Sequence, residues 1–558
     1  MTMNRRGLLG LFGAGAAAGA TPAMAAAAPV AFLHGVASGD PGTNRVILWT
    51  RVTPEGGFNG SVSVTWRVLE DEAVVASGRV ETGPERDYTV KIDATGLRPG
   101  RDYRYDFAVG DVRSPMGRTR TLAAEGMSPV NLAVVSCQLY PGGLFNAYEA
   151  VAALPSLDAV VHLGDYIYEY GAEPDAYGMV TGAALNRLPE PRHEIVTLTD
   201  YRTRHAQYKT DADLQAAHAR APFICVWDDH ETANDAWLHG AENHQSETEG
   251  DFAGRKAAAL KAYYEWMPIR EAAPGALKEA IHRSFHFGDL ASLMMVETRL
   301  TGRTEPLDYG KDLTAKDGPD GEPVLDLDAF RARLNDPSRD LMGSEQRDWL
   351  TRELSASKAA GRPWQVLGNQ VVTARVAGPD VSRAMTPEQI EGLMAQVPEA
   401  FREQFEQALF LFKMGLPFNL DAWDGYPAGR ERLYAVFAEA EVQPIVLAGD
   451  SHAFWVNELK DASGARRAVE FGTSAVSSPS IGDAIGGFPL GAALMQANDE
   501  VVFCDQSAKG FILLTLSADK AEAALMQVST LFAKPFEVSV LKRFSVGRDG
   551  GLVERAGG

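Results

Sequence analysis

The sequence predicts an α/β protein that carries an additional all-β domain at its N-terminal side. Its 558 residues are enough for two to four domains, and 45% hydrophobic with 23% charged residues is ordinary for a globular protein. Residues 30 to about 122 consist of short runs rich in Val, Thr, Tyr and Trp, which are typical of strands. From about residue 126, apolar runs alternate with helix-like segments, which indicates sheets covered by helices.

The first residues are typical of an export signal. Arg5 and Arg6 precede a Gly/Ala-rich run that ends in the A-x-A sequence at residues 23–25. We therefore predict a twin-arginine signal peptide at residues 1–28, the twin-arginine export machinery as a partner, and a periplasmic or secreted protein. An ordinary secretory signal is the alternative. No later stretch reaches the ~20 apolar residues that span a bilayer, so we expect no transmembrane segment after signal removal.

Residues 30–122 are predicted to form a β-sandwich. The runs VILWTRV, VSVTWRVLE and YTVKID are separated by turn-forming Gly, Pro and Asp. The stretch LRPGRDYRYDFAV, which starts at Leu97, resembles the L-x-P-G-x-x-Y-x-Y corner of fibronectin type III domains. A fibronectin/Ig-like domain that packs on the next domain, or shapes the mouth of its site, is the simplest interpretation.

Residues 126–520 are predicted to form the main domain, which residues 521–558 complete. Its apolar runs each end in polar or titratable residues: VNLAVVSCQ, LDAVVHLGD, FICVWDDHE, ASLMMVETR, WQVLGNQVV and VQPIVLAGDSH. In such sheets the ligand site lies beyond the carboxyl ends of the strands. We expect residues 301–340 to form a long surface loop over this crevice, and residues 510–555 to add edge strands.

The charge balance argues against nucleic acid as a regulatory partner. The chain has 53 basic and 74 acidic residues, a formal net charge of -21. Such a surface repels nucleic acid and anionic lipid at long range, although a local cationic site could still bind an anion.

The odd number of cysteines suggests that one of them has a special role. Cys225 lies inside an apolar run and Cys504 follows another, so both are expected in the core. Cys137 follows the run NLAVV at a predicted strand end. It is either a third buried hydrophobe or a thiolate that binds a metal ion.

Four titratable residues follow the run FICVW: Asp228, Asp229, His230 and Glu231. Carboxylates gathered this closely are normally held by a cation, because unpaired burial costs several kcal/mol per charge. A solvated loop or helix cap is the alternative. Asp228 is either a ligand or a residue that orients one.

The segment LGDYIY places Asp165 after a strand and Tyr168 three residues later. A lone Gly-Asp is usually a turn or cap. With a cation, Asp165 could bridge two metal ions while Tyr168 binds one of them, and a phenolate selects trivalent iron. Asp450 and His452 follow a later strand, and Asn369 offers a neutral oxygen donor after another.

The order of these motifs resembles that of the metallophosphoesterase superfamily, whose signature is D-x-H, GD-x-x, GNH-D/E and GH-x-H. SCQ and GDSH replace the first and last motifs, and these departures resemble the PhoD-type alkaline phosphatases. HGVASGDP, MGSEQRDWL, DAWDGYPAGR and FGTSAVSSPS match that family as well, so the resemblance covers almost the whole mature chain. It implies a four-layer β-sandwich flanked by helices, that is, an α/β metallophosphoesterase domain.

The resemblance also implies a site that holds Fe(III) with one or two Ca(II) ions. Carried over by motif, the iron ligands would be Cys137, Asp165, Tyr168 and His452. Asp165 would bridge to a second ion, whose further ligands would be Asp229, Asn369 and Asp450. The division of Asp450 and His452 between iron and calcium stays open.

The expected chemistry is hydrolysis of phosphate esters. Two cations would clamp the ester and activate a hydroxide that attacks phosphorus. His230 would contact the phosphate or protonate the leaving oxygen, and Arg299 is either a phosphate clamp or a surface ion pair with Glu297.

The substrate stays open between phosphomonoesters and phosphodiesters, and a phospholipase D-like diesterase belongs to the same family. A non-catalytic, metal-stabilised binding protein of the cell envelope is the alternative from another class. A heme or redox protein is not favoured, because the sequence lacks the C-x-x-C-H motif that attaches c-type heme.

Overall fold

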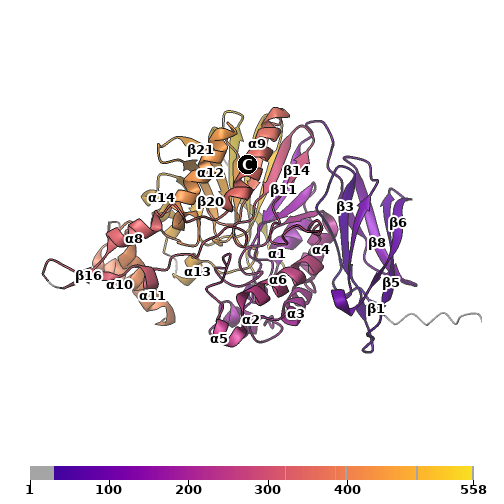
Figure 1. Cartoon of the computed structure of the whole chain (residues 1–558), viewed down its shortest axis with the longest axis horizontal. Helices are drawn as coiled ribbons and strands as arrows, with labels where there is room; N and C mark the ends of the chain where they lie inside the picture. The colour runs from indigo at the N-terminus through magenta and orange to yellow at the C-terminus, as the bar shows by residue number, and fades with distance from the viewer. Residues whose placement is uncertain (1–29, 321, 384, 396–398, 486–487, 556–558) are drawn as a thin grey trace, which may run out of the picture.

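A computed structural model of the chain describes residues 30–320, 322–383, 385–395, 399–485 and 488–555. The export signal predicted at residues 1–28 lies outside this part. Figure 1 shows three regions in a row: a β-sandwich, a central α/β core, and a lobe that contains α8, α10 and α11. Among the described helices, none is both long enough and apolar enough to cross a bilayer.

The larger sheet of the core has ten strands. Strands β11, β12 and β13 are parallel to one another at its centre, and β23 extends it antiparallel to β11. The C-terminal strands β24 to β26 form one edge, in agreement with the prediction for residues 510–555. In spatial order the strands are β26 (Leu552–Arg555), β25 (Val538–Gly547), β24 (Lys520–Val528), β23 (Lys509–Leu516), β11 (Val130–Val135), β12 (Ala159–His162), β13 (Phe223–Cys225), β2 (Val36–Gly39), β3 (Arg45–Arg51) and β7 (Thr89–Thr95).

The second sheet has seven strands, of which β15, β18, β19 and β21 are parallel. The strands β15, β18 and β19 are short, mainly apolar and buried along their whole length, as expected for a sheet covered on both sides, whereas β21 begins with two partly buried arginines. In spatial order the strands are β14 (Arg283–Phe287), β15 (Ala291–Met295), β18 (Trp364–Gly368), β19 (Ile445–Ala448), β21 (Arg466–Gly472), β20 (Phe454–Lys460) and β22 (Val501–Asp505).

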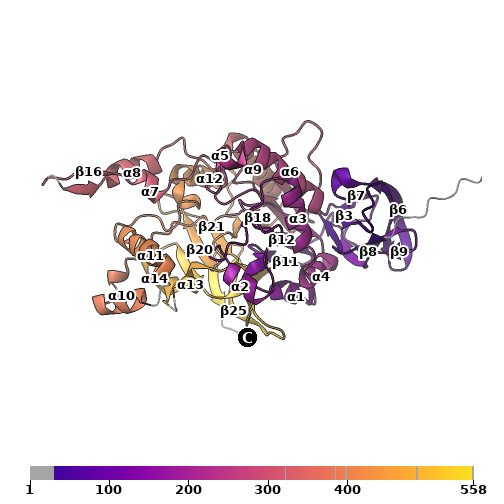
Figure 2. The ribbon, with the colours of Figure 1, turned by 90° about the horizontal axis from the view of Figure 1, so that it is seen from below.

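The two sheets pack face to face between two helical layers. Along β19, Ile445 and Leu447 belong to the core that is shared with the ten-stranded sheet, while Val446 and Ala448 belong to the core beneath the outer helices. This period of two places alternate side chains on opposite faces of the sheet. Figure 2 shows the layers from below.

The helices over the ten-stranded sheet are α1 (Asn146–Ala152), α3 (Leu198–Tyr208), α4 (Ala212–Arg220) and α6 (Phe252–Trp266). The helices over the seven-stranded sheet are α9 (Gly343–Ala359), α12 (Pro427–Glu439) and α14 (Leu490–Ala497). The predicted fold class is confirmed.

The N-terminal region is all-β, as predicted, but it shares a sheet with the core. Its own sheet contains β10 (Gly117–Arg120), β8 (Asp102–Val109), β5 (Val62–Glu70) and β6 (Ala73–Thr82), with β9 (Val112–Arg113) paired to β8. Leu48 of β3 and Val64 of β5 belong to one buried cluster, so the facing sheet of the sandwich is formed by β2, β3 and β7. These strands join the core where Gly39 pairs with Phe223. The predicted domain boundaries at 30–122, 126–520 and 521–558 stay a prediction.

Residues 301–340 are more ordered than the expected loop. They contain α7 (Tyr309–Asp312), the hairpin β16 (Ala315–Asp317) and β17 (Pro323–Leu325), and α8 (Leu327–Leu334). Phe330 packs with Leu411 and Leu416, at and after the end of α11 (Glu399–Phe412), because these apolar side chains need a shared core. The remaining helices and strands are short: β1 (Val30–Ala31), β4 (Thr53–Pro54), α2 (Met179–Ala184), α5 (Ser246–Glu249), α10 (Pro387–Met394) and α13 (Ile481–Ala484).

Candidate metal centre

The carboxyl ends of strands from both sheets deliver titratable side chains to one buried region. Cys137 follows β11, Asp165 follows β12, and Asp228 to Glu231 follow β13. From the seven-stranded sheet, Arg299 follows β15 and the pair Asp450 and His452 follows β19. The parallel arrangement explains the convergence, because the carboxyl ends of parallel strands lie at the same edge of a sheet.

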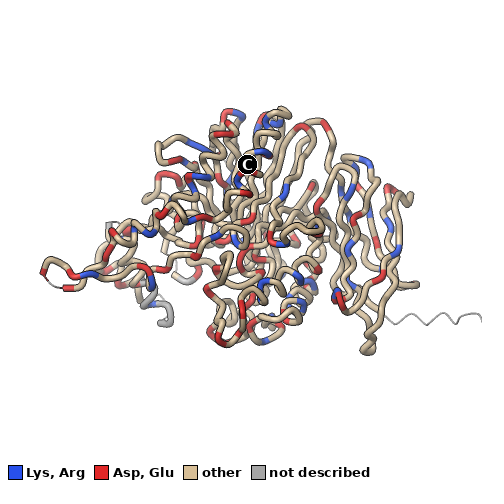
Figure 3. Tube along the Cα trace, in the orientation of Figure 1, with Lys and Arg blue, Asp and Glu red and all other residues tan. Residues whose placement is uncertain are grey.

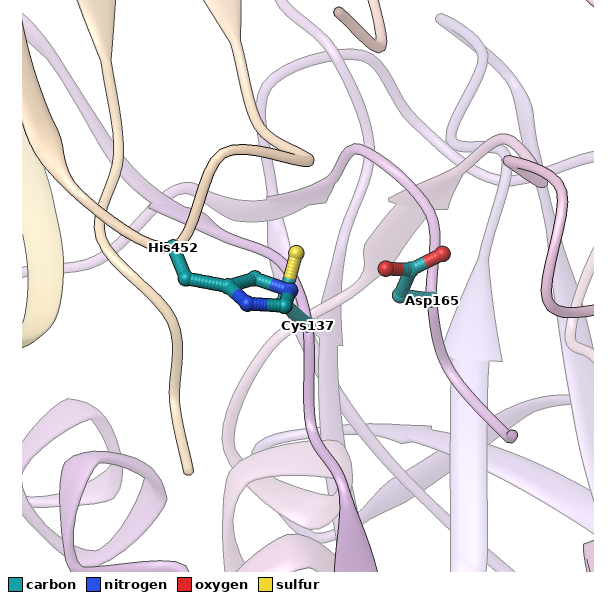
Figure 4. A group of neighbouring side chains, drawn as sticks. All are labelled: Cys137, Asp165 and His452. Carbon is teal, nitrogen blue, oxygen red and sulfur yellow. The ribbon is translucent and has the colours of Figure 1, made fainter. Parts of the chain in front are cut away.

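Cys137, Asp165 and His452 form the first cluster, with one possible ligand atom of each within 4.8 Å of the others. Figure 4 shows the three side chains approaching from three separate chain segments. The hydroxyl of Tyr168 donates to Asp165 Oδ2 at 2.9 Å and lies 3.2 Å from His452 Nε2. The four residues that the resemblance implies as iron ligands are therefore neighbours.

The backbone turns sharply at the residues that present these side chains. Cys137, Asp165, Asp450 and His452 have φ angles of 60°, 59°, 61° and 57°. For a residue other than glycine this left-handed conformation costs roughly 1–2 kcal/mol. Such strain persists only where the surrounding structure enforces it, and it is commonly found at functional sites.

The protonation states of this cluster suit a bound cation. His452 Nδ1 lies 2.6 Å from the carbonyl oxygen of Pro479, to which it donates, so Nε2 presents its lone pair to the cluster. Burial lowers the pKa of His452 to about 3, so the imidazole is neutral. Burial, followed by the charge of Asp165, raises the pKa of the Cys137 thiol. A bound cation would lower this pKa and stabilise the thiolate.

Asp228, Asp229 and Asp450 form a second cluster, and Asp165 links the two clusters because it also lies within 4.8 Å of Asp229 and His230. Three buried oxygens here have no hydrogen-bond partner among the described residues: Asp165 Oδ1, Asp228 Oδ2 and Asp229 Oδ1. A buried carboxylate oxygen without a partner costs several kcal/mol. This donor set fits hard cations that accept oxygen ligands.

The structure contradicts one of the two predicted roles of Arg299, the surface ion pair. It is fully buried, and its Nη1 donates to both carboxylate oxygens of Asp421, at 2.9 and 2.7 Å, while Nε donates to Asp228. The one hydrogen bond from Arg299 to Glu297 comes from the backbone N–H and not from the guanidinium, so the predicted surface ion pair with Glu297 is wrong. Because the guanidinium is occupied by carboxylates, the geometry favours a positioning role over a phosphate clamp.

The side-chain amide of Asn369 is hydrogen-bonded to protein groups, and its role as a metal ligand stays a prediction. Its amide nitrogen donates to the carbonyl oxygen of Val371 and to Thr373 Oγ1, and its amide oxygen accepts from the indole of Trp423 at 3.3 Å. No hydrogen bond joins Asn369 to the clustered carboxylates in the described part of the chain.

His230 is held in one orientation by Glu169, a residue to which sequence reasoning gave no role. His230 Nδ1 lies 2.7 Å from Glu169 Oε2, and Glu169 Oε1 accepts from Asn234 and Asn243 at 2.8 Å. Burial lowers the pKa of His230, but the carboxylates of Asp229 and Glu169 outweigh this effect and raise it well above 6.5. The imidazole is therefore protonated when no cation is bound.

Two further acidic residues at the site were also missed, Asp235 and Asp421, which lie within 4.8 Å of Asp229. Glu231, which the sequence analysis placed in the titratable run, accepts backbone N–H groups. Glu169, Asp235 and Asp421 all lie inside the stretches GDYIYEYG, VWDDHETAND and DAWDGYPAGR, whose resemblance was the available signal.

The fold and the site define an α/β protein whose strand ends assemble a candidate centre for more than one cation. The chain belongs to the PhoD-like phosphatase family: the family profile matches residues 132–525, and the profile of the PhoD-like phosphatase N-terminal domain matches residues 17–123.

Two known proteins are similar over most of the chain. Alkaline phosphatase D of Bacillus subtilis (strain 168) is 36% identical over 440 residues, which are 77% of this chain and 65% of that relative's length. The solved structure of PhoD has a TM-score of 0.75 and 31% identity, and the match covers 94% of this chain and 92% of that one.

Proposed function

We propose that this protein is an exported, metal-dependent phosphatase or phosphodiesterase that hydrolyses phosphate esters. Membership of the PhoD-like phosphatase family supports this proposal. The observation that carries it is the set of three buried carboxylate oxygens without a hydrogen-bond partner, on Asp165, Asp228 and Asp229. Arg299 already forms ion pairs with Asp228, Asp229 and Asp450, and bound cations would supply partners for the oxygens that still lack a hydrogen bond.

The donor chemistry supports iron beside Cys137 and calcium beside the aspartates. A thiolate, a phenolate, an imidazole and a carboxylate together favour trivalent iron, and they come from Cys137, Tyr168, His452 and Asp165. Carboxylates alone favour calcium, so we assign Asp228, Asp229 and Asp450 to it, and Asp450 rather than His452. When bound, such cations neutralise charge on a phosphate ester and acidify a coordinated water.

The protein side chains would then orient the substrate and move protons. His230 is held by Glu169 through Nδ1, which leaves Nε2 beside Asp165 and Asp229 to donate a proton to the leaving oxygen. Arg299 would keep Asp228 and Asp421 in place through its buried guanidinium.

Hydrolysis assays on the metal-loaded protein test the proposal. Wild-type protein should hydrolyse p-nitrophenyl phosphate or its bis ester, and Asp165→Asn should abolish turnover because Asp165 joins the two clusters. Asp111→Asn, in the exposed turn between β8 and β9, is the matched control and should keep full activity. A wild-type protein that retains its metals and cleaves neither ester would instead be a metal-stabilised binding protein.

Export through the twin-arginine machinery forms part of the proposal. It rests on Arg5 and Arg6 ahead of the Gly/Ala-rich run. Replacing both by lysine should leave the protein uncleaved inside the cell. Unchanged export of that variant would favour an ordinary secretory route.

A further inference from the structure

A polar cavity lies between the sandwich and the α/β core, far from the metal centre. Its volume is about 530 Å³, and its walls come from β8 and β10 on one side and from residues 155–157 and 220–222 on the other. Residues 155–157 and 220–222 precede β12 and β13, so the cavity lies at the amino ends of these strands. The candidate metal centre lies at their opposite, carboxyl ends.

Arginines dominate the walls of this cavity. Arg104 of β8 and Arg118 of β10 are direct cross-strand partners, and Arg120 lies on the same face two residues further along β10. Arg220, the last residue of α4, approaches from the core. Like charges directly opposite each other on a sheet are destabilising, so this arrangement favours an anion between them.

Two of the four guanidinium groups have no carboxylate partner. Arg104 pairs with Glu72 at 2.8 Å, and Arg120 pairs with Asp158. In the described part of the chain, Arg118 has no side-chain hydrogen bond or ion pair, and Arg220 donates only to the carbonyl oxygen of Leu154, at 3.1 Å. Most of their N–H donors are therefore available to a ligand.

Three acidic residues also line the cavity, and two of them lie beside the paired arginines. Glu72 is the partner of Arg104, and Asp102 lies 3.5 Å from Arg120 with its side chain 82% exposed. Asp71, the third, is an exposed residue. Figure 3 shows Lys and Arg along the sandwich strands next to the core, and Arg118 and Arg220 are the two arginines of the cavity without a carboxylate partner in the described part of the chain.

We propose that this interdomain cavity is a second anion site, which binds a phosphate group through Arg118 and Arg220. The planar guanidinium fork matches two phosphate oxygens, and two free guanidinium groups balance a dianion. The source of the group is either inorganic phosphate or a phosphate of a polymeric phosphoester whose chain also reaches the metal centre. The polymer source rests on the proposed function, whereas phosphate binding at the cavity does not.

Equilibrium dialysis of the full-length, metal-loaded protein against radiolabelled inorganic phosphate tests the first source. Wild-type protein should bind one more phosphate per chain than the double variant Arg118→Ala/Arg220→Ala. Arg79→Ala, on the exposed strand β6, is the matched control and should bind as wild type does. Unchanged hydrolysis of p-nitrophenyl phosphate by the double variant would show that its metal centre is intact.

The KM for a glycerol phosphate polymer tests the second source. The double variant should raise that KM at least several-fold while the KM for bis(p-nitrophenyl) phosphate stays constant. A loss of bound phosphate alone assigns the cavity to inorganic phosphate, and a change in polymer KM alone assigns it to the polymer. If neither quantity changes, the proposal is overturned, whatever the hydrolytic activity of the protein.

Discussion

Glu231 ties together the two turns that present the candidate ligands of the ten-stranded sheet. Its Oε2 accepts the backbone N–H of Asp165 at 3.1 Å and that of Asp228 at 2.8 Å, and its Oε1 accepts the N–H of Tyr166. One buried carboxylate thus fixes the ends of β12 and β13 relative to each other. The positions of Asp165 and Asp228 depend on a side chain that belongs to none of the candidate metal clusters.

Glu231→Gln should therefore weaken metal binding while the fold is retained. The amide has a single acceptor oxygen, so its NH₂ would face at least one of the three N–H groups, at a cost of about 1–3 kcal/mol. Loss of a residue that orients metal ligands typically lowers metal affinity by roughly 10–100-fold. Metal titration should show such a loss, whereas Glu247→Gln, in the exposed helix α5, should bind as wild type does. Equal affinities for both variants would contradict this role.

Cys137→Ser should remove iron from the protein together with any visible charge-transfer absorbance. Serine keeps the size of the side chain, but its hydroxyl does not ionise as a thiol does when a metal binds. Cys504→Ser is the control, because Cys504 is buried in the hydrophobic core beneath the outer helices and belongs to none of the candidate metal clusters. An unchanged iron content in Cys137→Ser would refute the thiolate ligand.

His230→Asn should impair hydrolysis most for poor leaving groups. A phenolate that leaves from phenyl phosphate needs a proton more than p-nitrophenolate does, and general acid catalysis typically contributes 10²–10⁴-fold. The rate on phenyl phosphate should therefore fall much further than the rate on p-nitrophenyl phosphate. Glu169→Gln should show the same pattern to a smaller extent, since Glu169 orients the imidazole. A uniform loss on both substrates would show that His230 does not protonate the leaving oxygen.

Lys209 should make the protein more stable as the pH rises. The residue is buried, its Nζ donates to the hydroxyl of Tyr166 at 2.8 Å, and it has no ion pair with a described carboxylate. Burial lowers its pKa from 10.5 to about 7. Between these values the unfolded chain binds the proton and the folded chain does not, so the free energy of unfolding increases with pH.

The comparison of wild type with Lys209→Met measures this effect. Denaturant titrations between pH 7 and pH 10 should give a wild-type free energy of unfolding that rises more steeply with pH, by about 1.4 kcal/mol per pH unit. A constant offset from the lost hydrogen bond to Tyr166 does not alter this slope. Parallel curves would mean that Lys209 keeps its proton when buried.

The sequence could predict the strand ends because continuous apolar runs that stop at titratable residues are a local pattern. Cys137, Asp165 and His452 were found in this way, and the structure brings them together. Contacts that depend on distant segments had no such signal. The contact between Arg299 and Asp421, which are 122 residues apart in the sequence, could not be predicted without the structure.

The sequence also could not predict that the N-terminal strands and the core share one sheet. A single pairing, between Phe223 and Gly39, joins the N-terminal strands to the core, and neither residue has a pattern that predicts its partner. The position of Asn369 could not be foreseen either, because an amide after a strand fits a ligand and a structural hydrogen bond equally well. In the structure its oxygen accepts from Trp423.

The claim on which the mechanism depends is that cations neutralise the carboxylates between Cys137 and Asp450. Elemental analysis of the protein, purified without chelators from the compartment in which it functions, tests it most directly. We predict more than one metal ion per chain, iron among them, and their loss in Asp165→Asn. A fully active preparation that contains no metal would contradict the account.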